Sequence, residues 1–326
     1  MIGNLKKKIS PLIKHNVRKM YSLTRKKITG FDCFPLIRIE VSGKCNLSCI
    51  HCYRTMYDYR SKNDNLRFDL FAKIIDENVT YTPLDRQSLM LQGVGEPTLH
   101  PDFAKMIDYA KSSKKFHTII TTSNMLAVPV VKYDQYFDNG LDWIFVSIDS
   151  LNSQTIRASR RGTDVNRLMG NIKNVVNKHG DKVEFLTVLS KKNISELEAI
   201  ANFLLSIGAI KWNIQPLQDM TSRHFLLNSE DVKLCNDVIE TYRSRIHVNR
   251  LEIESFTRCR QPWESLCINS SGYVMPCSLW CDHNIINFGE VENENIYKIF
   301  NSEKFNVFRE NMYKLRPEIC NNCPFY

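Results

Sequence analysis

The sequence predicts an α/β protein with a second, smaller region at its C-terminal end, on two observations. Between residues 36 and 216, short runs rich in Val, Ile, Phe and Thr alternate with patterns typical of helices. Several of these runs are continuously apolar, as expected of parallel strands buried on both faces. After about residue 217 the alternation ends and a cysteine-rich segment follows. We therefore expect a parallel core with a C-terminal region packed tightly on it.

The expected elements follow one another in strand–helix order. Predicted strands lie at 36–42, 88–92, 117–122, 143–149, 183–189 and 211–215. Predicted helices lie at 68–79, 102–113, 128–138, 164–178, 194–207, 229–245 and 295–313. Ser195 and Glu198 have the spacing of a capping box at the start of the helix over 194–207. Strands separated by helices indicate right-handed βαβ units, whose spacing fits either a partial barrel or an open doubly wound sheet.

The composition excludes several protein classes. The chain has 326 residues, 43% of them hydrophobic, which suits a globular core and not a disordered chain. It contains no apolar run of about 18 residues, and its N-terminus lacks the uninterrupted apolar core of a signal peptide. We therefore expect a cytoplasmic protein without a transmembrane segment. In that compartment its 11 cysteines indicate metal binding or catalysis, not a disulfide framework.

Much of the net charge of +9 lies near the N-terminus, where nine lysines and arginines fall between residues 5 and 27. Apolar residues recur among them at helical spacing, so residues 1–32 are predicted to be a basic helical segment. The simpler interpretation is a peripheral helix with a solvated basic face. The alternative is contact with an anionic partner such as a membrane surface or a phosphorylated substrate. We expect no nucleic-acid partner.

The most informative motif is C-x3-C-x2-C, formed by Cys45, Cys49 and Cys52 directly after the first predicted strand. Three thiolates on one loop can ligate three irons of a [4Fe–4S] cube and leave the fourth iron open. An open iron can bind and reduce a ligand, whereas a fully ligated cube mainly passes electrons. A zinc site is the alternative, but zinc usually takes four ligands in paired C-x2-C knuckles.

This spacing, within CNLSCIHCY, resembles the radical S-adenosylmethionine (radical SAM) superfamily. The resemblance implies that the open iron chelates the amino and carboxylate groups of SAM. Reductive cleavage then yields a 5′-deoxyadenosyl radical that removes a hydrogen atom from the substrate. It also selects the partial, six-stranded (β/α)6 barrel over the open sheet, and it implies a reduced electron donor of the flavodoxin or ferredoxin type.

Further residues are assigned to the SAM site by the same resemblance. GVGEP, with Gly93, Gly95 and Glu96, matches the glycine-rich motif whose backbone groups hold the methionine ammonium of SAM. Glycines there allow close approach of the backbone to a ligand. Polar groups at the ends of the next strands are expected to contact the ribose or carboxylate: Ser123, Asn124 and Ser147, with Asp149 nearby. Arg161, or Arg160 instead, is expected to pair with the carboxylate, and His51 to pack beside the adenine.

Four more cysteines form a second set: Cys259, Cys277, Cys320 and Cys323. With Gly272 they read C-x12-G-x4-C followed by C-x2-C, which resembles the auxiliary-cluster region of SPASM and twitch enzymes. No C-x5-C-x3-C follows, so the match is to the shorter twitch form of 2-deoxy-scyllo-inosamine dehydrogenase-like members. Four thiolates imply a second, fully ligated [4Fe–4S] cluster with an electron-relay or structural role, although a zinc ribbon uses the same ligands.

The remaining cysteines have weaker assignments. Cys267 and Cys281 are alternative ligands of the second cluster, or thiols that return a hydrogen atom in an epimerase. Cys235 is expected to be a buried packing thiol, and Cys33 is assigned no role. The expected organisation is a basic segment at 1–32, a radical SAM partial barrel at 33–220 and an α+β auxiliary-cluster domain at 221–326.

Three functions remain open at this point. The first is oxidation of a sugar, aminocyclitol or similar small metabolite, with the second cluster accepting the remaining electron. The second is modification of a peptide or protein by crosslinking, epimerisation or maturation. The third is a non-enzymatic iron–sulfur or zinc protein. Glu184, Gln215 and Gln218 on the later strands are candidates to face the substrate.

Overall fold

The computed structural model describes residues 35–56, 63–78, 87–217, 225–252, 259–314, 316–321 and 323. These residues belong to one compact unit within residues 33–326. The predicted basic segment at 1–32, together with Cys33 and Gln218, lies outside the described residues.

A nine-stranded sheet in the order β11-β10-β1-β3-β4-β5-β7-β8-β9 dominates the described residues. Each predicted strand is present: β1 (Leu36–Ile39), β3 (Ser88–Leu91), β4 (Thr118–Ser123), β5 (Trp143–Ser147), β7 (Val183–Leu189) and β8 (Lys211–Pro216). Three strands from the second half of the chain extend the sheet: β9 (His247–Val248), β10 (Ser265–Ile268) and β11 (Val274–Met275). All neighbours in this sheet are parallel except β10 and β11, which are antiparallel. The described strands do not close into a ring, which agrees with a partial barrel.

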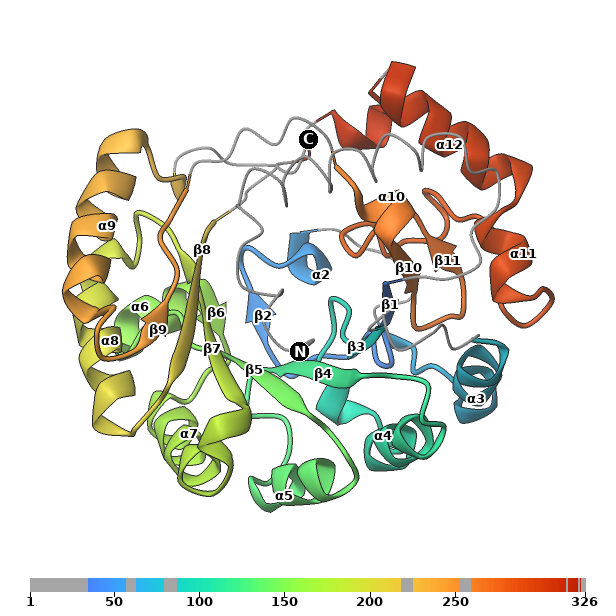
Figure 1. Ribbon diagram of the computed structural model, residues 1–326. Coiled ribbons are helices and arrows are strands. Elements are labelled where there is room, and N and C mark those ends of the chain that lie inside the picture. Colours follow the sequence, from blue (N-terminus) through green and yellow to red (C-terminus); the bar gives the residue numbers. More distant parts are fainter. Residues whose placement is uncertain are drawn as a thin grey trace, which may run out of the picture. The chain divides into compact units, whose positions relative to one another are not determined.

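Helices follow the strands and cover the outer side of the curved sheet (Figure 1). Those of the barrel are α3 (Phe68–Glu77), α4 (Phe103–Ser112), α5 (Val131–Asp138), α6 (Ser153–Ser159), α7 (Val165–His179) and α8 (Leu197–Ser206). Later in the chain come α9 (Ser229–Tyr242), α10 (Gln261–Glu264), α11 (Ile296–Phe300) and α12 (Glu303–Lys314). The last two replace the single helix predicted over 295–313. The Ser302 hydroxyl accepts a bond from the Phe305 amide at 3.3 Å, which starts a new helix after the break.

The predicted capping box of Ser195 and Glu198 is wrong. Residues Ile194–Glu196 form a 3₁₀ turn, and the α-helix starts at Leu197 without a side-chain cap. A capping box does occur at α9, where Asn228 and Asp231 bond each other's backbone amides.

Residues on the barrel strands alternate between two environments. Ile37 and Ile39 of β1 are fully buried on the helix-facing side, whereas Arg38 between them is half-buried on the inner side. The same alternation holds along β3, β4, β5 and β7. The hydrophobic core therefore lies between sheet and helices, and the inner face is left for polar side chains that build a site.

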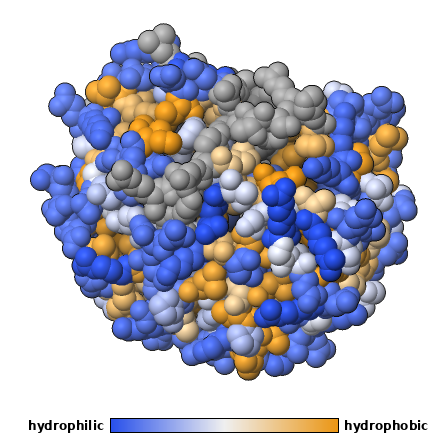
Figure 2. Space-filling model, turned by 180° about the vertical axis from the view of Figure 1, so that it is seen from behind, coloured by the Kyte–Doolittle hydropathy of each residue, from blue (hydrophilic) through white to orange (hydrophobic). Residues whose placement is uncertain are grey.

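One face of the molecule is mainly polar. On the face shown in Figure 2, hydrophilic residues cover most of the surface and hydrophobic residues show through in smaller patches. Among the described residues, no helix has the length and apolar character needed to span a membrane.

Candidate functional site

The first cysteine motif lies on the loop that leaves β1 and leads into the short helix α2 (Tyr53–Met56). All three thiols, Cys45, Cys49 and Cys52, are half-buried. Burial raises the pKa of Cys45, and it raises that of Cys52 to about 11. The amide of Leu47 donates to Cys45 Sγ at 3.4 Å, and Asn124 Nδ2 lies 3.9 Å from the same sulfur. Hydrogen-bond donors of this kind stabilise thiolates that bind iron and tune the potential of the cluster.

The donor set of this loop suits an iron–sulfur cluster. The described residues contain no group of three His, Cys, Asp or Glu side chains that converges as the ligands of one metal ion do. Cysteines that share a four-iron cube do not need to converge in this way, because each thiolate binds a different iron. Three half-buried thiols on one loop, with amide donors near Cys45, fit such a cube.

The GVGEP segment packs directly on the cysteine loop. The Glu96 amide donates to the Lys44 carbonyl at 2.7 Å. A Cβ added to Gly95 would overlap the Ser42 carbonyl, and one added to Gly93 would overlap the Glu40 side chain. The two glycines therefore permit a close approach between this segment and the cysteine loop of the chain itself.

Glu96 is buried and holds the end of β4 against this segment. Its Oε1 accepts bonds from Thr98 Oγ1 at 2.7 Å and Ser123 Oγ at 2.9 Å, and its Oε2 accepts one from the Asn124 amide at 2.8 Å. Burial raises the pKa of Glu96, and these hydrogen bonds oppose the rise. The Ser123 hydroxyl, which also contacts Tyr133 Oη at 2.8 Å, lies on the helix-facing side of β4. It bonds Glu96 from the helix-facing side of the strand, so in the structure its position is that of a residue that orients Glu96.

Of the two candidate arginines, Arg160 is the one that lies beside the cysteine loop. Strand β6 (Arg160–Arg161) pairs antiparallel with β2 (Ser48–Cys49), and this pairing sets Arg160 opposite Cys49. Arg160 is 9% exposed, with its Nε 3.5 Å from Asp149 Oδ2, whereas Arg161 is exposed. Burial acts to lower the pKa of Arg160, but Asp149 and the Cys49 thiol outweigh it and raise that pKa. The alternative assignment, Arg160, therefore fits the site better than Arg161.

The other expected residues of this site lie around the same loop. His51 Nε2 is 3.9 Å from Asp149 Oδ2, which makes no hydrogen bond to a described residue. Asn124 donates to Asn46 Oδ1 at 2.9 Å and so bridges the end of β4 to the cysteine loop. Ser147 ends β5 on the inner side of the sheet. The structure thus gathers these side chains at the carboxyl ends of the strands, where barrels place their catalytic loops.

The second set of cysteines lies on segments that flank the β10–β11 hairpin. Cys259 precedes α10, Cys277 follows β11, and Cys320 ends a 3₁₀ turn. Burial raises the pKa of all three, and neighbouring cysteines of the set contribute to the rise. Arg316 donates to the carbonyls of Cys320 at 2.7 Å and Cys323 at 3.0 Å, which fixes the C-x2-C turn.

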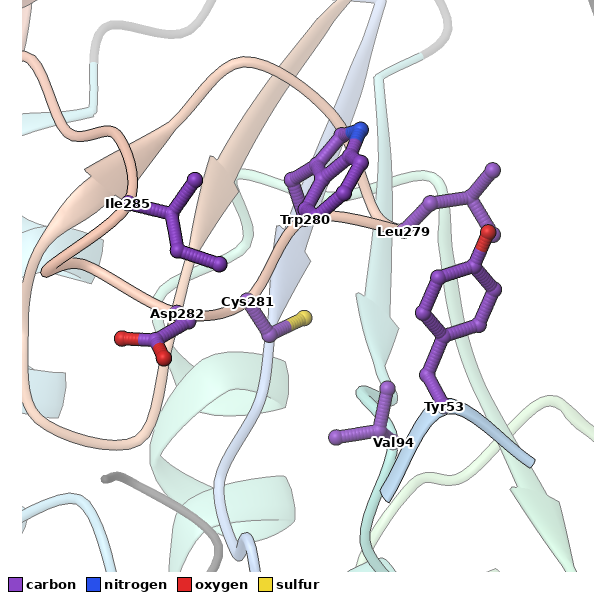
Figure 3. Close-up of a pocket in the computed structure, with 7 residues that line it drawn as sticks. All are labelled: Tyr53, Val94, Leu279, Trp280, Cys281, Asp282 and Ile285. Atoms are coloured by element: carbon purple, nitrogen blue, oxygen red, sulfur yellow. The ribbon is translucent and has the colours of Figure 1, made fainter. Parts of the chain in front are cut away.

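Cys267 and Cys281 are buried thiols between the two sets, and Cys235 is buried in the core face of α9 as predicted. Cys281 lines a small pocket with Tyr53, Val94 and Trp280, and its side chain points toward Val94 and Tyr53 (Figure 3). The rings of Tyr53 and Trp280 are arranged edge to face, with their centroids 6.3 Å apart. The segment after Cys277 therefore packs against α2, directly after the cysteine loop, and lines a pocket together with Val94 of GVGEP.

A cavity of about 630 Å³ opens on the inner side of the sheet. Its wall combines inward side chains of the barrel strands with residues of the C-terminal region, among them Gln261, Ser278 and Leu279. Gln92 adjoins Gly93 and Ser278 adjoins Cys277, so the cavity extends between the two cysteine-bearing regions. Glu184 and Gln215, expected to face the substrate, both line it.

Two residues of this region were missed by the sequence analysis. Glu40 is 2% exposed and bridges two segments: its Oε1 accepts from the Val94 amide at 2.9 Å, and its Oε2 accepts from the amide and hydroxyl of Ser270 at 3.1 and 3.0 Å. Arg38 projects into the cavity. The sequence feature that could have revealed both residues is their charge: each is a charged residue within or just after the apolar strand sequence LIRIEV.

Comparison with known proteins agrees with this geometry. The model of the radical SAM superfamily matches residues 39–204, and that of SPASM, an iron-sulfur cluster-binding domain, matches residues 259–324. The tungsten-containing aldehyde ferredoxin oxidoreductase cofactor-modifying protein of Pyrococcus furiosus is 23% identical over 83% of this chain and 82% of its own length. The antilisterial bacteriocin subtilosin biosynthesis protein AlbA of Bacillus subtilis is 22% identical over 91% of this chain and 67% of its own.

Solved structures share the fold. BtrN in complex with AdoMet and 2-DOIA superposes with a TM-score of 0.53 at 14% identity, over 86% of this chain and 87% of BtrN. Streptococcus suis SuiB bound to the precursor peptide SuiA superposes with a TM-score of 0.65 at 14% identity, over 94% and 74% of the two chains. The cofactors of the two matched domains are SAM and [4Fe–4S] clusters. The chain belongs to the radical SAM superfamily and carries a C-terminal SPASM-type iron–sulfur domain.

Proposed function

We propose that this radical SAM enzyme dehydrogenates a small polar metabolite, such as a sugar or an aminocyclitol, in the cavity inside its barrel. The observation that carries the proposal is the position of this cavity, whose wall includes both Gln92, next to GVGEP, and Ser278, next to Cys277. A substrate held there lies between the region that binds SAM and the region that binds the second cluster. When bound, SAM and the two clusters supply a hydrogen-atom acceptor and an acceptor for the electron left on the substrate.

The side chains around this cavity suit a hydroxylated ligand. Most are amides or other polar groups, including Gln92, Asn213, Gln215 and Gln261. Such groups can donate to and accept from hydroxyls. The volume of about 630 Å³ is typical of small-molecule sites.

Oxidation of a secondary alcohol also releases the hydroxyl proton, and we assign its uptake to Glu184. Its carboxyl lines the cavity, and partial burial raises its pKa, while Lys211 and a hydrogen bond from Asn213 oppose the rise. A carboxylate whose pKa lies closer to neutrality is a better proton acceptor. Among the residues lining the cavity, Glu184 combines this basicity with a position on the inner face of β7.

Peptide modification is the second candidate. The likeness to AlbA and to SuiB with its precursor peptide favours it at the level of the fold, and the likeness to BtrN with 2-DOIA favours a small molecule in the same way. Fold alone does not choose between them. The cavity wall, rich in amide groups, is the local observation that favours the metabolite.

The test uses full-length protein reconstituted without oxygen, with dithionite as the reductant in place of a flavodoxin- or ferredoxin-type donor. It should hold about eight irons, and replacing Cys45, Cys49 and Cys52 together should leave about four. Panels of sugars, aminocyclitols and short peptides are then added with SAM. A product that has lost two hydrogen atoms, formed in step with 5′-deoxyadenosine, supports dehydrogenation. Turnover by peptides alone would assign the enzyme to the second candidate.

A further inference from the structure

We infer that the substrate carries an anionic group, a carboxylate or a phosphate, and that Arg38 binds it. This inference rests on the proposed function, because it assumes that the substrate occupies the cavity inside the barrel. It names a property of the substrate that neither the family nor the relatives determine.

Arg38 faces the cavity from the middle of β1. In the sheet its neighbours in register are Cys267 of β10 and Met90 of β3, so all three side chains share the inner face. Ile37 and Ile39 on either side of it point into the hydrophobic core. The strand therefore presents Arg38 to the interior. Glu40, two residues on, lines a small pocket with it, but both Glu40 oxygens accept hydrogen bonds from Val94 and Ser270.

The Arg38 guanidinium lacks the partner that such a cation ordinarily has. Nη1 donates to the thioether of Met90 at 3.0 Å, and sulfur is a weak acceptor. Its Nε is buried without a hydrogen bond, and no ion pair joins Arg38 to a carboxylate in the described part of the chain. A partly buried guanidinium without an anion is unfavourable. Arg38, which has no carboxylate partner, is therefore suited to bind a ligand that carries an anionic group.

A second donor lies beside Arg38 on this wall of the cavity. Gln92 lines the cavity next to Arg38, and its Oε1 already accepts a bond from Thr122 Oγ1 at 2.9 Å. The amide nitrogen of Gln92 is thus the group that can donate to a ligand. A guanidinium with an amide NH2 group beside it is a set of donors, and it is complementary to carboxylate or phosphate oxygens.

Two carboxylates line the cavity, and neither lies on the strand that carries Arg38. Glu184 belongs to β7, and three strands, β3, β4 and β5, separate β7 from β1 in the sheet. Glu252 follows β9, as does a second arginine of the lining, Arg250, which already forms an ion pair with Glu240 at 3.6 Å. A substrate with an anionic group at Arg38 would present its hydroxyl-bearing carbon toward the opposite side, where Glu184 is proposed to take up the proton.

The decisive measurement is anion binding by full-length, cluster-loaded protein saturated with SAM, titrated calorimetrically with inorganic phosphate and, separately, with acetate. Wild-type protein should bind at least one anion saturably, and Arg38→Met should bind it about tenfold or more weakly. Arg38→Lys should be intermediate, because lysine keeps the charge but not the fork of donors. Arg167→Met, which removes an exposed arginine from α7, is the matched control and should bind as the wild type does. Tighter binding of phosphate than of acetate indicates that the substrate is phosphorylated. Tighter binding of acetate indicates that the substrate carries a carboxylate.

A purely structural role for Arg38 predicts a different outcome. If its guanidinium awaits a ligand, Arg38→Met should melt no lower than the wild type, because it removes an uncompensated charge. Equal anion affinity in Arg38→Met, or no saturable anion binding to the wild type, would overturn the inference. A comparable loss of SAM affinity in Arg38→Met would also overturn it, because Arg38 would then hold the carboxylate of SAM. Formation of 5′-deoxyadenosine does not depend on these outcomes, so the proposed function can survive the failure of this inference.

Discussion

Replacing Glu40 with glutamine is the sharpest test of how the GVGEP segment is held. Glu40 presents one oxygen to the Val94 amide and the other to the amide and hydroxyl of Ser270. Both sides therefore contain a backbone N–H, which can donate and cannot accept. A glutamine amide has one oxygen and one NH2 group, so in either orientation a buried N–H faces another donor.

The magnitude follows from that mismatch. A buried donor left without an acceptor costs about 1–3 kcal/mol, and the hydrogen bonds that remain lose the assistance of the carboxylate charge. We therefore expect Glu40→Gln to lower the free energy of unfolding by about 3 kcal/mol and the melting temperature by about 5 °C. The amide that the glutamine releases most easily is that of Val94, because Ser270 offers two donors that compete for the one remaining oxygen. Loosening of GVGEP should then weaken SAM binding roughly tenfold.

The assay measures thermal unfolding and SAM affinity of the cluster-loaded protein without oxygen. The matched control is Glu196→Gln, because Glu196 also accepts three hydrogen bonds, from Ser150 Oγ and from the amides of Leu151 and Asn152, but on a single oxygen, Oε2. A glutamine there can keep all three. Equal losses in the two variants would show that loss of charge, and not the opposed donors, causes the effect, and unchanged SAM affinity in Glu40→Gln would refute the reasoning.

Two further predictions concern the same framework. Gly95→Ala should reduce 5′-deoxyadenosine formation at least tenfold, because its Cβ would overlap the Ser42 carbonyl and push GVGEP off the cysteine loop; normal rates would contradict the packing described. Asn228→Ala removes the cap of α9 and should cost about 1 kcal/mol in thermal unfolding without changing SAM affinity.

The strands of the barrel could be predicted because each is a local, apolar run. β7 was predicted at its observed bounds, and the other strands differ by one to three residues at an end. The parallel pairing of β10 with β1 could not be predicted in this way. It joins residues more than two hundred positions apart, and it depends on tertiary packing and not on local propensity.

The position of the cysteine loop follows from spacing along the chain, whereas the placement of the residues around it depends on which face of a strand each one occupies. Cys45, Cys49 and Cys52 are recognisable because one loop carries all three. Arg160 and Arg161 differ by one position, and successive residues of a strand point to opposite faces, so only the β2–β6 register decides between them. The same alternation sends Ser123 toward the helices and leaves Thr122 on the wall of the cavity.

The C-terminal region is part of the framework that holds the SAM motif, and not an addition to a finished barrel. Strand β10 completes the hydrogen bonding of β1, and the Glu40 amide continues this ladder to the Ile268 carbonyl at 2.9 Å. On the outer side, Lys73 of α3 donates to the Val291 carbonyl, and Glu77 accepts from the Ile296 amide.

One consequence concerns electron transfer. The hairpin that carries Cys277 also carries Ser270, and Ser270 shares the Glu40 carboxyl with the Val94 amide of GVGEP. A displacement of the second cluster's ligands would therefore be transmitted through Glu40 to the segment proposed to hold SAM. In the proposed dehydrogenation the substrate lies between these two regions. The hydrogen bonds that stabilise the fold would then also fix the distances from the substrate to the proposed hydrogen-atom acceptor and to the proposed electron acceptor.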